Sequence, residues 1–135
     1  VKYSSQQKKK RLECGIQQIY EQIGTKTLKQ IGKRVPETAV WPPEIITIED
    51  ALASIDAAYQ MNHRGGEIGY YRFTKTGERT GEMLCYNPYP CPFDEGIIDT
   101  IARKFASQAN RVRIEHGKDF CRQKGADTCT YLIFW

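Results

Sequence analysis

The period of the hydrophobic pattern changes along the chain, and this change constrains the fold more than any other feature. In the first half, apolar residues recur at helical spacing in residues 6–23 and again in residues 25–33. From residue 69 the pattern alternates, and residues 69–73 and 80–86 are predicted to form two strands. A chain ordered in this way belongs to a class with helices and a sheet rather than to an all-helical class.

Turn and cap residues divide the helical half. Residues 35–46 are predicted to be an irregular loop, because Pro36, Pro42 and Pro43 interrupt any regular helix there. Thr47 and Asp50 resemble a capping box, which predicts a third helix that ends within residues 61–66.

The second half continues with a helix and two more strands. Residues 93–106 carry apolar side chains on one helical face, with Asp94 as the predicted N-cap. Residues 111–116 and 128–134 are predicted strands. The fold class is therefore α+β: an antiparallel sheet of about four strands packed with helices, the N-terminal helices coming first.

Length and composition favour a single domain. The chain has 135 residues, of which 40% are hydrophobic and 27% are charged, so we expect residues 1–135 to form one folded unit. Residues 1–11 are expected to be a basic lead-in or linker, because much of the net charge of +4 lies at residues 8–11. No aromatic residues interleave with that run, so nucleic-acid binding is a poor fit. No apolar run is long enough to span a membrane, and a cytoplasmic protein is expected.

The cysteines carry the strongest chemical signal. There are five, and an odd number argues against a complete disulfide framework. Cys121 and Cys129 flank a predicted reversal, and Cys91 lies at a helix start, where a thiolate is stabilised. With Glu115 or His116 as a fourth ligand, three thiolates would suit structural zinc. The spacing alone also allows small buried hydrophobes or a facultative disulfide.

Three stretches resemble a known family: residues 92–98 (PFDEGII), residues 112–116 (VRIEH) and residues 121–131 (CRQKGADTCTY). Together they resemble the 4-vinyl reductase domain and the related ligand-sensing domain of aromatic-responsive bacterial activators. In that family an apolar helix opens with a Pro-Phe…Gly element, a strand ends in Glu, and a loop with two cysteines precedes the last strand.

The resemblance implies zinc held by three cysteines and one glutamate. Cys121 and Cys129 match this set, and Cys91 matches in approximate position. The spacer before Cys121 is longer than in those relatives. The fourth ligand therefore stays open between Glu115, His116 and Cys85.

The resemblance also implies a regulatory domain that senses a small hydrophobic or aromatic molecule, without being an enzyme. Five aromatic residues could line its pocket, with ordinary core packing as the alternative: Trp41, Tyr59, Tyr71, Phe93 and Phe105. A homodimer and an effector domain in a longer chain are the expected partners.

Three other functions are weighed against sensing. One is an enzyme or accessory protein of tetrapyrrole vinyl reduction, and another is a metal-stabilised protein-interaction module. Haem-based sensing is less favoured, because the Tyr-x-Ser-x-Arg pattern for haem propionates is absent. Of the two histidines, His63 lies among polar residues and is predicted to face solvent.

Overall fold

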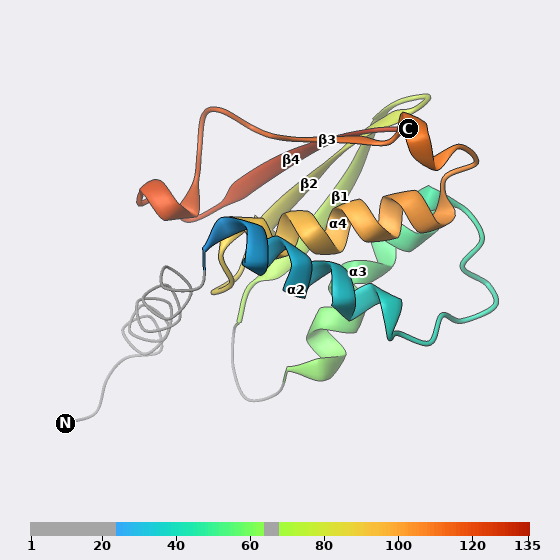
Figure 1. The fold of residues 1–135 in the computed structure, drawn as a ribbon, viewed down its shortest axis with the longest axis horizontal. Coiled ribbons are helices and arrows are strands. Elements are labelled where there is room, and N and C mark those ends of the chain that lie inside the picture. The colour runs from blue at the N-terminus through green and yellow to red at the C-terminus, as the bar shows by residue number, and fades with distance from the viewer. Residues whose placement is uncertain (1–23, 64–67) are drawn as a thin grey trace.

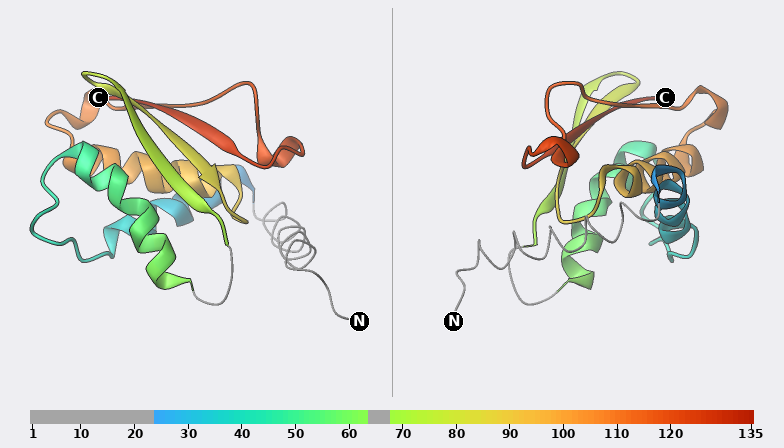
Figure 2. Two further views of the ribbon diagram at one scale, coloured as in Figure 1. Left: turned by 180° about the vertical axis from the view of Figure 1, so that it is seen from behind. Right: turned by 60° about the vertical axis from the view of Figure 1, so that its left-hand side comes forward.

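The computed structural model describes residues 24–63 and 68–135, in which three helices cover one face of a four-stranded antiparallel sheet (Figure 1, Figure 2). The α+β class and the sheet of four strands are confirmed. The helices are α2 (Thr25–Glu37), α3 (Ile48–Asn62) and α4 (Cys91–Phe105). The strands are β1 (Tyr70–Gly77), β2 (Thr80–Tyr86), β3 (Arg113–His116) and β4 (Cys129–Phe134), and two 3-10 turns span Ala109–Arg111 and Arg122–Lys124. None of the described helices has the length and apolar character needed to cross a bilayer.

The last strand lies inside the sheet rather than at its edge. The strand order is β1-β2-β4-β3, and all neighbours are antiparallel. Along β4, buried residues alternate with partly exposed ones, so Cys129, Tyr131 and Ile133 face the helices. This register places Cys129 opposite Cys85 of β2. It also brings Cys129 next to Cys91, the first residue of α4.

Some predicted boundaries differ from the structure. Helix α2 continues through Pro36 to Glu37, where Thr38 donates its hydroxyl hydrogen bond to the carbonyls of Arg34 and Val35. Pro36 is buried, so packing of its ring offsets the lost hydrogen bond. Strand β1 extends to Gly77, which leaves a shorter turn than predicted. The predicted first helix, residues 6–23, lies outside the described residues.

The helix caps give one confirmed prediction and one wrong one. Thr47 and Asp50 form the predicted capping box, with distances of 3.1 and 3.3 Å between backbone nitrogen and side-chain oxygen. Asp94 is not the N-cap of α4: Pro90 holds that position, and Asp94 is fully buried in the first turn of the helix. Its carboxylate faces the core because it has partners there, which are described below.

Helices α2 and α4 pack closely through two glycines. A Cβ atom on Gly96 would lie 2.2 Å from the carbonyl oxygen of Lys29, and one on Gly32 would lie 2.1 Å from that of Phe93. Both obstacles are backbone atoms, which cannot move without shifting a helix. The pair therefore sets the distance between α2 and α4, and with it one wall of the cavity described below.

We expect Gly96→Ala to lower the free energy of unfolding by about 2–3 kcal/mol, because the methyl group forces the helices apart. Urea denaturation followed by circular dichroism measures the change. Gln30→Ala, on the exposed side of α2, is the control and should stay within about 0.5 kcal/mol of the native chain. Equal stability of the two variants would show that α2 and α4 can move apart without a cost in unfolding free energy.

Candidate metal centre and ligand cavity

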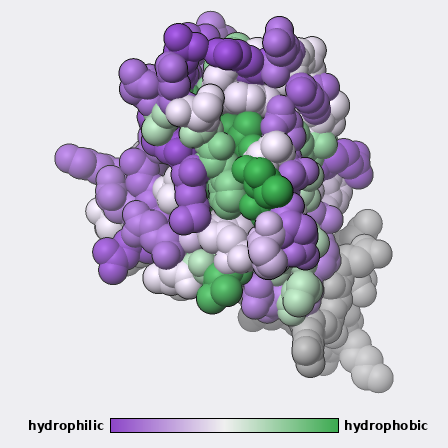
Figure 3. Space-filling model, turned by 90° about the vertical axis from the view of Figure 1, so that its right-hand side faces the viewer, coloured by the Kyte–Doolittle hydropathy of each residue, from purple (hydrophilic) through white to green (hydrophobic). Residues whose placement is uncertain are grey.

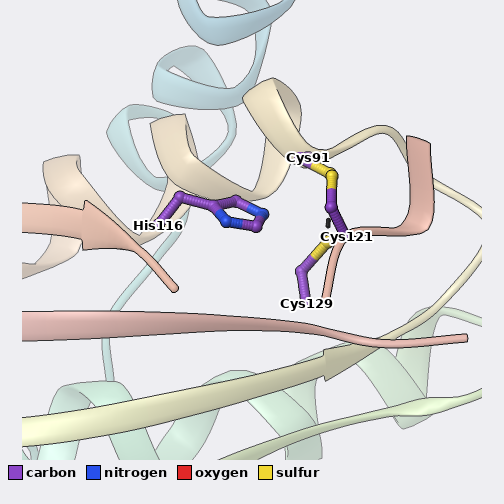
Figure 4. Close-up of side chains that lie close together, drawn as sticks. All are labelled: Cys91, His116, Cys121 and Cys129. Atoms are coloured by element: carbon purple, nitrogen blue, oxygen red, sulfur yellow. Dashed lines mark hydrogen bonds between the residues drawn. The ribbon is translucent and has the colours of Figure 1, made fainter. Parts of the chain in front are cut away.

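Four potential metal ligands converge at one end of the sheet (Figure 4). Cys91 is the first residue of α4, His116 is the last of β3, Cys121 precedes the 3-10 turn and Cys129 opens β4. Their ligand atoms all lie within 4.8 Å of one another. The Sγ atom of Cys91 lies 3.0 Å from that of Cys129 and 3.4 Å from that of Cys121. This donor set, three sulfurs and one imidazole nitrogen, is typical of structural zinc.

The ring of His116 is oriented for ligation and points toward the sulfurs in Figure 4. Its Nδ1 lies 2.5 Å from the carbonyl oxygen of Gly117, which can only accept, so Nδ1 carries the proton. Its Nε2 is buried and has no hydrogen-bond partner among the described residues. An imidazole fixed by a backbone carbonyl, with its other nitrogen free, is the arrangement that metal-bound histidines adopt.

The Cys129 sulfur is surrounded by groups that can donate hydrogen bonds. The Sγ atom of Cys91 lies 3.0 Å from it, and the backbone nitrogen and Nε of Arg122 lie 3.2 and 3.4 Å from it. The hydrogen bond from Cys91, together with Arg122, lowers the pKa of Cys129 to about 4. The same bond to Cys129, followed by burial, raises the pKa of Cys91. The lowered pKa of Cys129 favours its thiolate, which is the form that binds metal.

A buried ion pair connects this cluster to the core. The Asp94 carboxylate is fully buried and pairs with the Arg122 guanidinium, which is itself 6% exposed. Asp94 also accepts hydrogen bonds from the Tyr71 hydroxyl at 2.5 Å and the Asn87 amide at 3.0 Å. Burial raises the pKa of Asp94, while Arg122, Tyr71 and Asn87 act to lower it. Burial disfavours the charge of Arg122, but Asp94 and Cys129 hold its pKa above the usual value.

Sequence reasoning missed both members of this pair. Asp94 is predicted from the sequence to be a helix N-cap, and Arg122 receives no role. A signal was present for Asp94, because it shares one helical face with Ile97, Ile98 and Ile101. A carboxylate on an otherwise apolar face needs a buried partner. Nothing in the spacing identifies Arg122 as that partner, because 28 residues separate the two.

A cavity of about 450 Å³ lies among α2, α3, α4 and β1. Four of the five aromatic residues predicted for a pocket line it: Trp41, Tyr59, Tyr71 and Phe93. Phe105 is not in the lining but packs edge-on against Trp41, with ring centroids 5.0 Å apart. The remaining lining residues are Val35, Pro36, Ala39, Ser54, Ile55, Ala58, Asn62, His63, Tyr89, Ile97 and Ile101.

The α2–α3 loop, which carries Trp41, lies on the right-hand side of the molecule in Figure 1. Figure 3 shows this side with apolar residues gathered in its middle and polar residues around them. Val40, beside Trp41, is 96% exposed. This face therefore presents apolar groups to solvent beside a loop that also contributes to the cavity wall.

His63 does not face solvent as predicted. It is half-buried in the cavity wall, with Nδ1 2.8 Å from the carbonyl oxygen of Tyr59 and Nε2 2.7 Å from the hydroxyl of Tyr89. The carbonyl fixes the proton on Nδ1, so Nε2 accepts from Tyr89. The prediction failed because it rested on local sequence alone, whereas the imidazole packs against the rings of Tyr59 and Tyr89.

The other two candidates for a fourth ligand lie outside the cluster. Glu115 is exposed on the face of β3 opposite to His116 and pairs with Arg113 at 2.8 Å. Cys85 is fully buried in β2, where it is the strand-pairing partner of Cys129 in β4. The geometry favours His116, and metal ligation itself stays a prediction.

Comparisons with known proteins show the fold alone. No protein-family model matches the sequence, and no curated protein matches it significantly. An H-NOX protein from S. oneidensis, solved in the Fe(II)NO ligation state, has a TM-score of 0.58 at 14% identity. The alignment covers 98% of this chain and 76% of the H-NOX protein. An H-NOX domain from Shewanella oneidensis in the Fe(II)CO ligation state has a TM-score of 0.60 at 16% identity. This alignment covers 91% of this chain and 72% of the H-NOX domain.

These neighbours correct the family expected from sequence. The resemblance of residues 87–135 to the 4-vinyl reductase domain is wrong as an assignment, because no model of that family matches and the similar solved structures are H-NOX domains. The chain therefore has an H-NOX-like fold.

Proposed function

We propose that this chain is a sensing domain that binds a small, uncharged, largely apolar molecule in the cavity among α2, α3, α4 and β1. The observation that carries the proposal is the cavity itself. Its volume of about 450 Å³ falls within the range of small-molecule sites, and its lining is mostly aliphatic and aromatic. No Lys, Arg, Asp or Glu is among the described lining residues, so a charged ligand would be buried without a counter-ion.

The proposal gives the four-ligand cluster a structural role, with zinc as the metal. A tetrahedral zinc with Zn–S bonds of about 2.3 Å separates its sulfurs by about 3.8 Å. The observed sulfur–sulfur separations of 3.0 and 3.4 Å are slightly shorter than this distance. Small rotations of the cysteine side chains would lengthen them to it. Four protein ligands leave no open coordination position, so the metal would hold the loop before β4 against α4 rather than catalyse a reaction.

Haem is the second candidate ligand, because the neighbours of similar fold are H-NOX proteins in Fe(II) ligation states. His63 is the lining histidine, but both of its ring nitrogens already have protein partners. The two haem carboxylates would also need cationic partners, and the described lining contains no Lys or Arg. The cavity therefore does not fit haem, and the sensing proposal concerns an organic ligand.

Sensing also requires an output. A homodimer or an effector domain would supply it if the ligand binds more tightly to one arrangement of the domains or subunits than to another. Both partners, the cytoplasmic location and the absence of catalysis stay predictions.

Tetralin, an uncharged bicyclic hydrocarbon, is a suitable probe of the cavity. At ten times its Kd it should stabilise the native chain by about 1.4 kcal/mol, which is about 5 °C in melting temperature for a domain of this size. Ser54→Phe, which places a ring in the cavity, should abolish the shift, while Ser54→Ala should keep it. Differential scanning calorimetry gives the measurement.

Two results would overturn the proposal. One is the absence of any shift with tetralin in the native chain. The other is a Soret absorption band in the purified protein, or after incubation with haemin, that disappears in His63→Ala. That band would establish the haem alternative.

A further inference from the structure

A chain of polar contacts joins the metal cluster to the wall of the cavity. At one end, Nε of Arg122 lies 3.4 Å from the sulfur of Cys129. The same guanidinium pairs with the carboxylate of Asp94, which accepts the hydroxyl of Tyr71 at 2.5 Å. Tyr71 lines the cavity. Asp94 and Tyr71 are buried and the Arg122 side chain is nearly so, and solvent therefore screens these contacts little.

Two further connections run from the cluster to the same wall. Arg122 also donates to the side chain of Asn87, which accepts from the backbone N–H of Tyr89, a lining residue. Cys91 is the first residue of α4, and Phe93, two positions later, lines the cavity. Three residues of the cavity wall are therefore tied to the cluster.

The cluster is also open to solvent on one side. Cys91, His116 and Cys121 line a second cavity of about 410 Å³, whose lining includes the exposed Lys118 and Lys124. Cys121 is itself only half-buried. A metal ion can reach the cluster by this entry path while the domain stays folded. Occupancy of the site can therefore follow the metal concentration around the protein.

Resting on the proposed function, we propose that metal is a second input to this domain: zinc at the cluster and the ligand in the cavity strengthen each other's binding through Arg122, Asp94 and Tyr71. Three thiolates and a neutral imidazole around Zn²⁺ carry one net negative charge, which the Arg122 guanidinium balances. The loaded cluster holds the guanidinium, the guanidinium holds Asp94, and Asp94 holds the ring of Tyr71 in the wall. A ligand that enters a wall already ordered loses less conformational entropy.

Two Tyr-to-Phe variants, both in the cavity wall, test the coupling. Tyr71→Phe removes the hydroxyl that Asp94 accepts, whereas Tyr59→Phe removes a hydroxyl that donates to the Ile68 carbonyl. Isothermal titration calorimetry gives the Kd of tetralin for each chain, loaded with zinc and after a chelator has removed it. We expect zinc to tighten tetralin binding about tenfold in the native chain and in Tyr59→Phe. In Tyr71→Phe the factor should fall to about threefold or less, because only the connections through Asn87 and α4 remain.

The reciprocal measurement starts from the zinc-loaded chain. Coupling between two sites is mutual, so saturating tetralin should lower the Kd of zinc by the same factor, measured by competition with a chromophoric chelator. An unchanged Kd of zinc would overturn the coupling. Loss of the fold on zinc removal would raise the tetralin factor alike in all three chains, and circular dichroism detects it. A factor as large in Tyr71→Phe as in the native chain overturns the inference.

The outcomes separate this inference from the proposed function. If tetralin binds neither form of the native chain, the cavity is not a ligand site and both fail. If tetralin binds equally well with and without zinc, the sensing proposal stands and the coupling is wrong. If the native chain takes up no zinc, the metal centre and the coupling fail together, while tetralin binding still supports the cavity as a ligand site.

Discussion

Cys129→Ser is expected to remove zinc from this protein and to unfold it at markedly lower temperature. The Cys129 sulfur is contacted by both Cys91 and Arg122, and its lowered pKa favours the thiolate that binds metal. Serine is not ionised at neutral pH, and it is a poor zinc ligand. If the native chain is saturated with zinc at about 1,000 times its Kd, losing the metal costs about 4 kcal/mol of unfolding free energy. Inductively coupled plasma mass spectrometry should find one zinc per native chain and almost none in the variant.

Strand β3 offers a matched control for this experiment. His116→Gln and Glu115→Gln alter adjacent residues on opposite faces, one aimed at the sulfurs and the other exposed. We expect His116→Gln to lower zinc content and to make the melting temperature insensitive to a chelator, while Glu115→Gln behaves as the native chain. If Glu115→Gln loses the metal and His116→Gln keeps it, the glutamate is the ligand. If the native chain holds no zinc and ignores added zinc, the metal centre is wrong.

Local signals were sufficient to predict most of the secondary structure. The capping box at Thr47 and the alternation in residues 80–86 depend on neighbours within a few positions, and both appear as expected. Boundaries failed where tertiary contacts outweighed local preference. Helix α2 passes through Pro36 because that ring is buried.

The candidate site was predicted in part, because it depends on the order of the strands. The sequence nominates Cys91, Cys121 and Cys129 as ligands, but not the fourth. His116 enters the cluster, and Glu115 does not, because β3 pairs with β4 in a register that turns the imidazole inward. A shift of one residue in that pairing would exchange the two side chains. Pairings of this kind are set by packing across the whole sheet and leave no local signal.

The second large effect is expected at the buried ion pair. Asp94→Ala should lower the unfolding free energy by about 3–5 kcal/mol, because it removes the carboxylate that pairs with the buried Arg122 guanidinium. The neighbouring Tyr71 hydroxyl and Asn87 amide lose their acceptor as well. Urea denaturation at neutral pH is the measurement. The exposed pair of Arg113 and Glu115 is the control, and Glu115→Ala should cost no more than about 1 kcal/mol.

A double variant separates the charge of this pair from its geometry. In Asp94→Leu with Arg122→Met, both charges are gone, and Leu keeps the branched arrangement of heavy atoms that Asp has. A buried ion pair gives little net stability over an apolar pair, so most of the loss seen in Asp94→Ala should be recovered. Zinc binding should nevertheless weaken, because the guanidinium no longer contacts the Cys129 sulfur. If stability returns and zinc affinity is unchanged, the pair is a packing element without influence on the metal. If stability does not return, the hydrogen bonds of Asp94 to Tyr71 and Asn87 carry the energy instead of the charge.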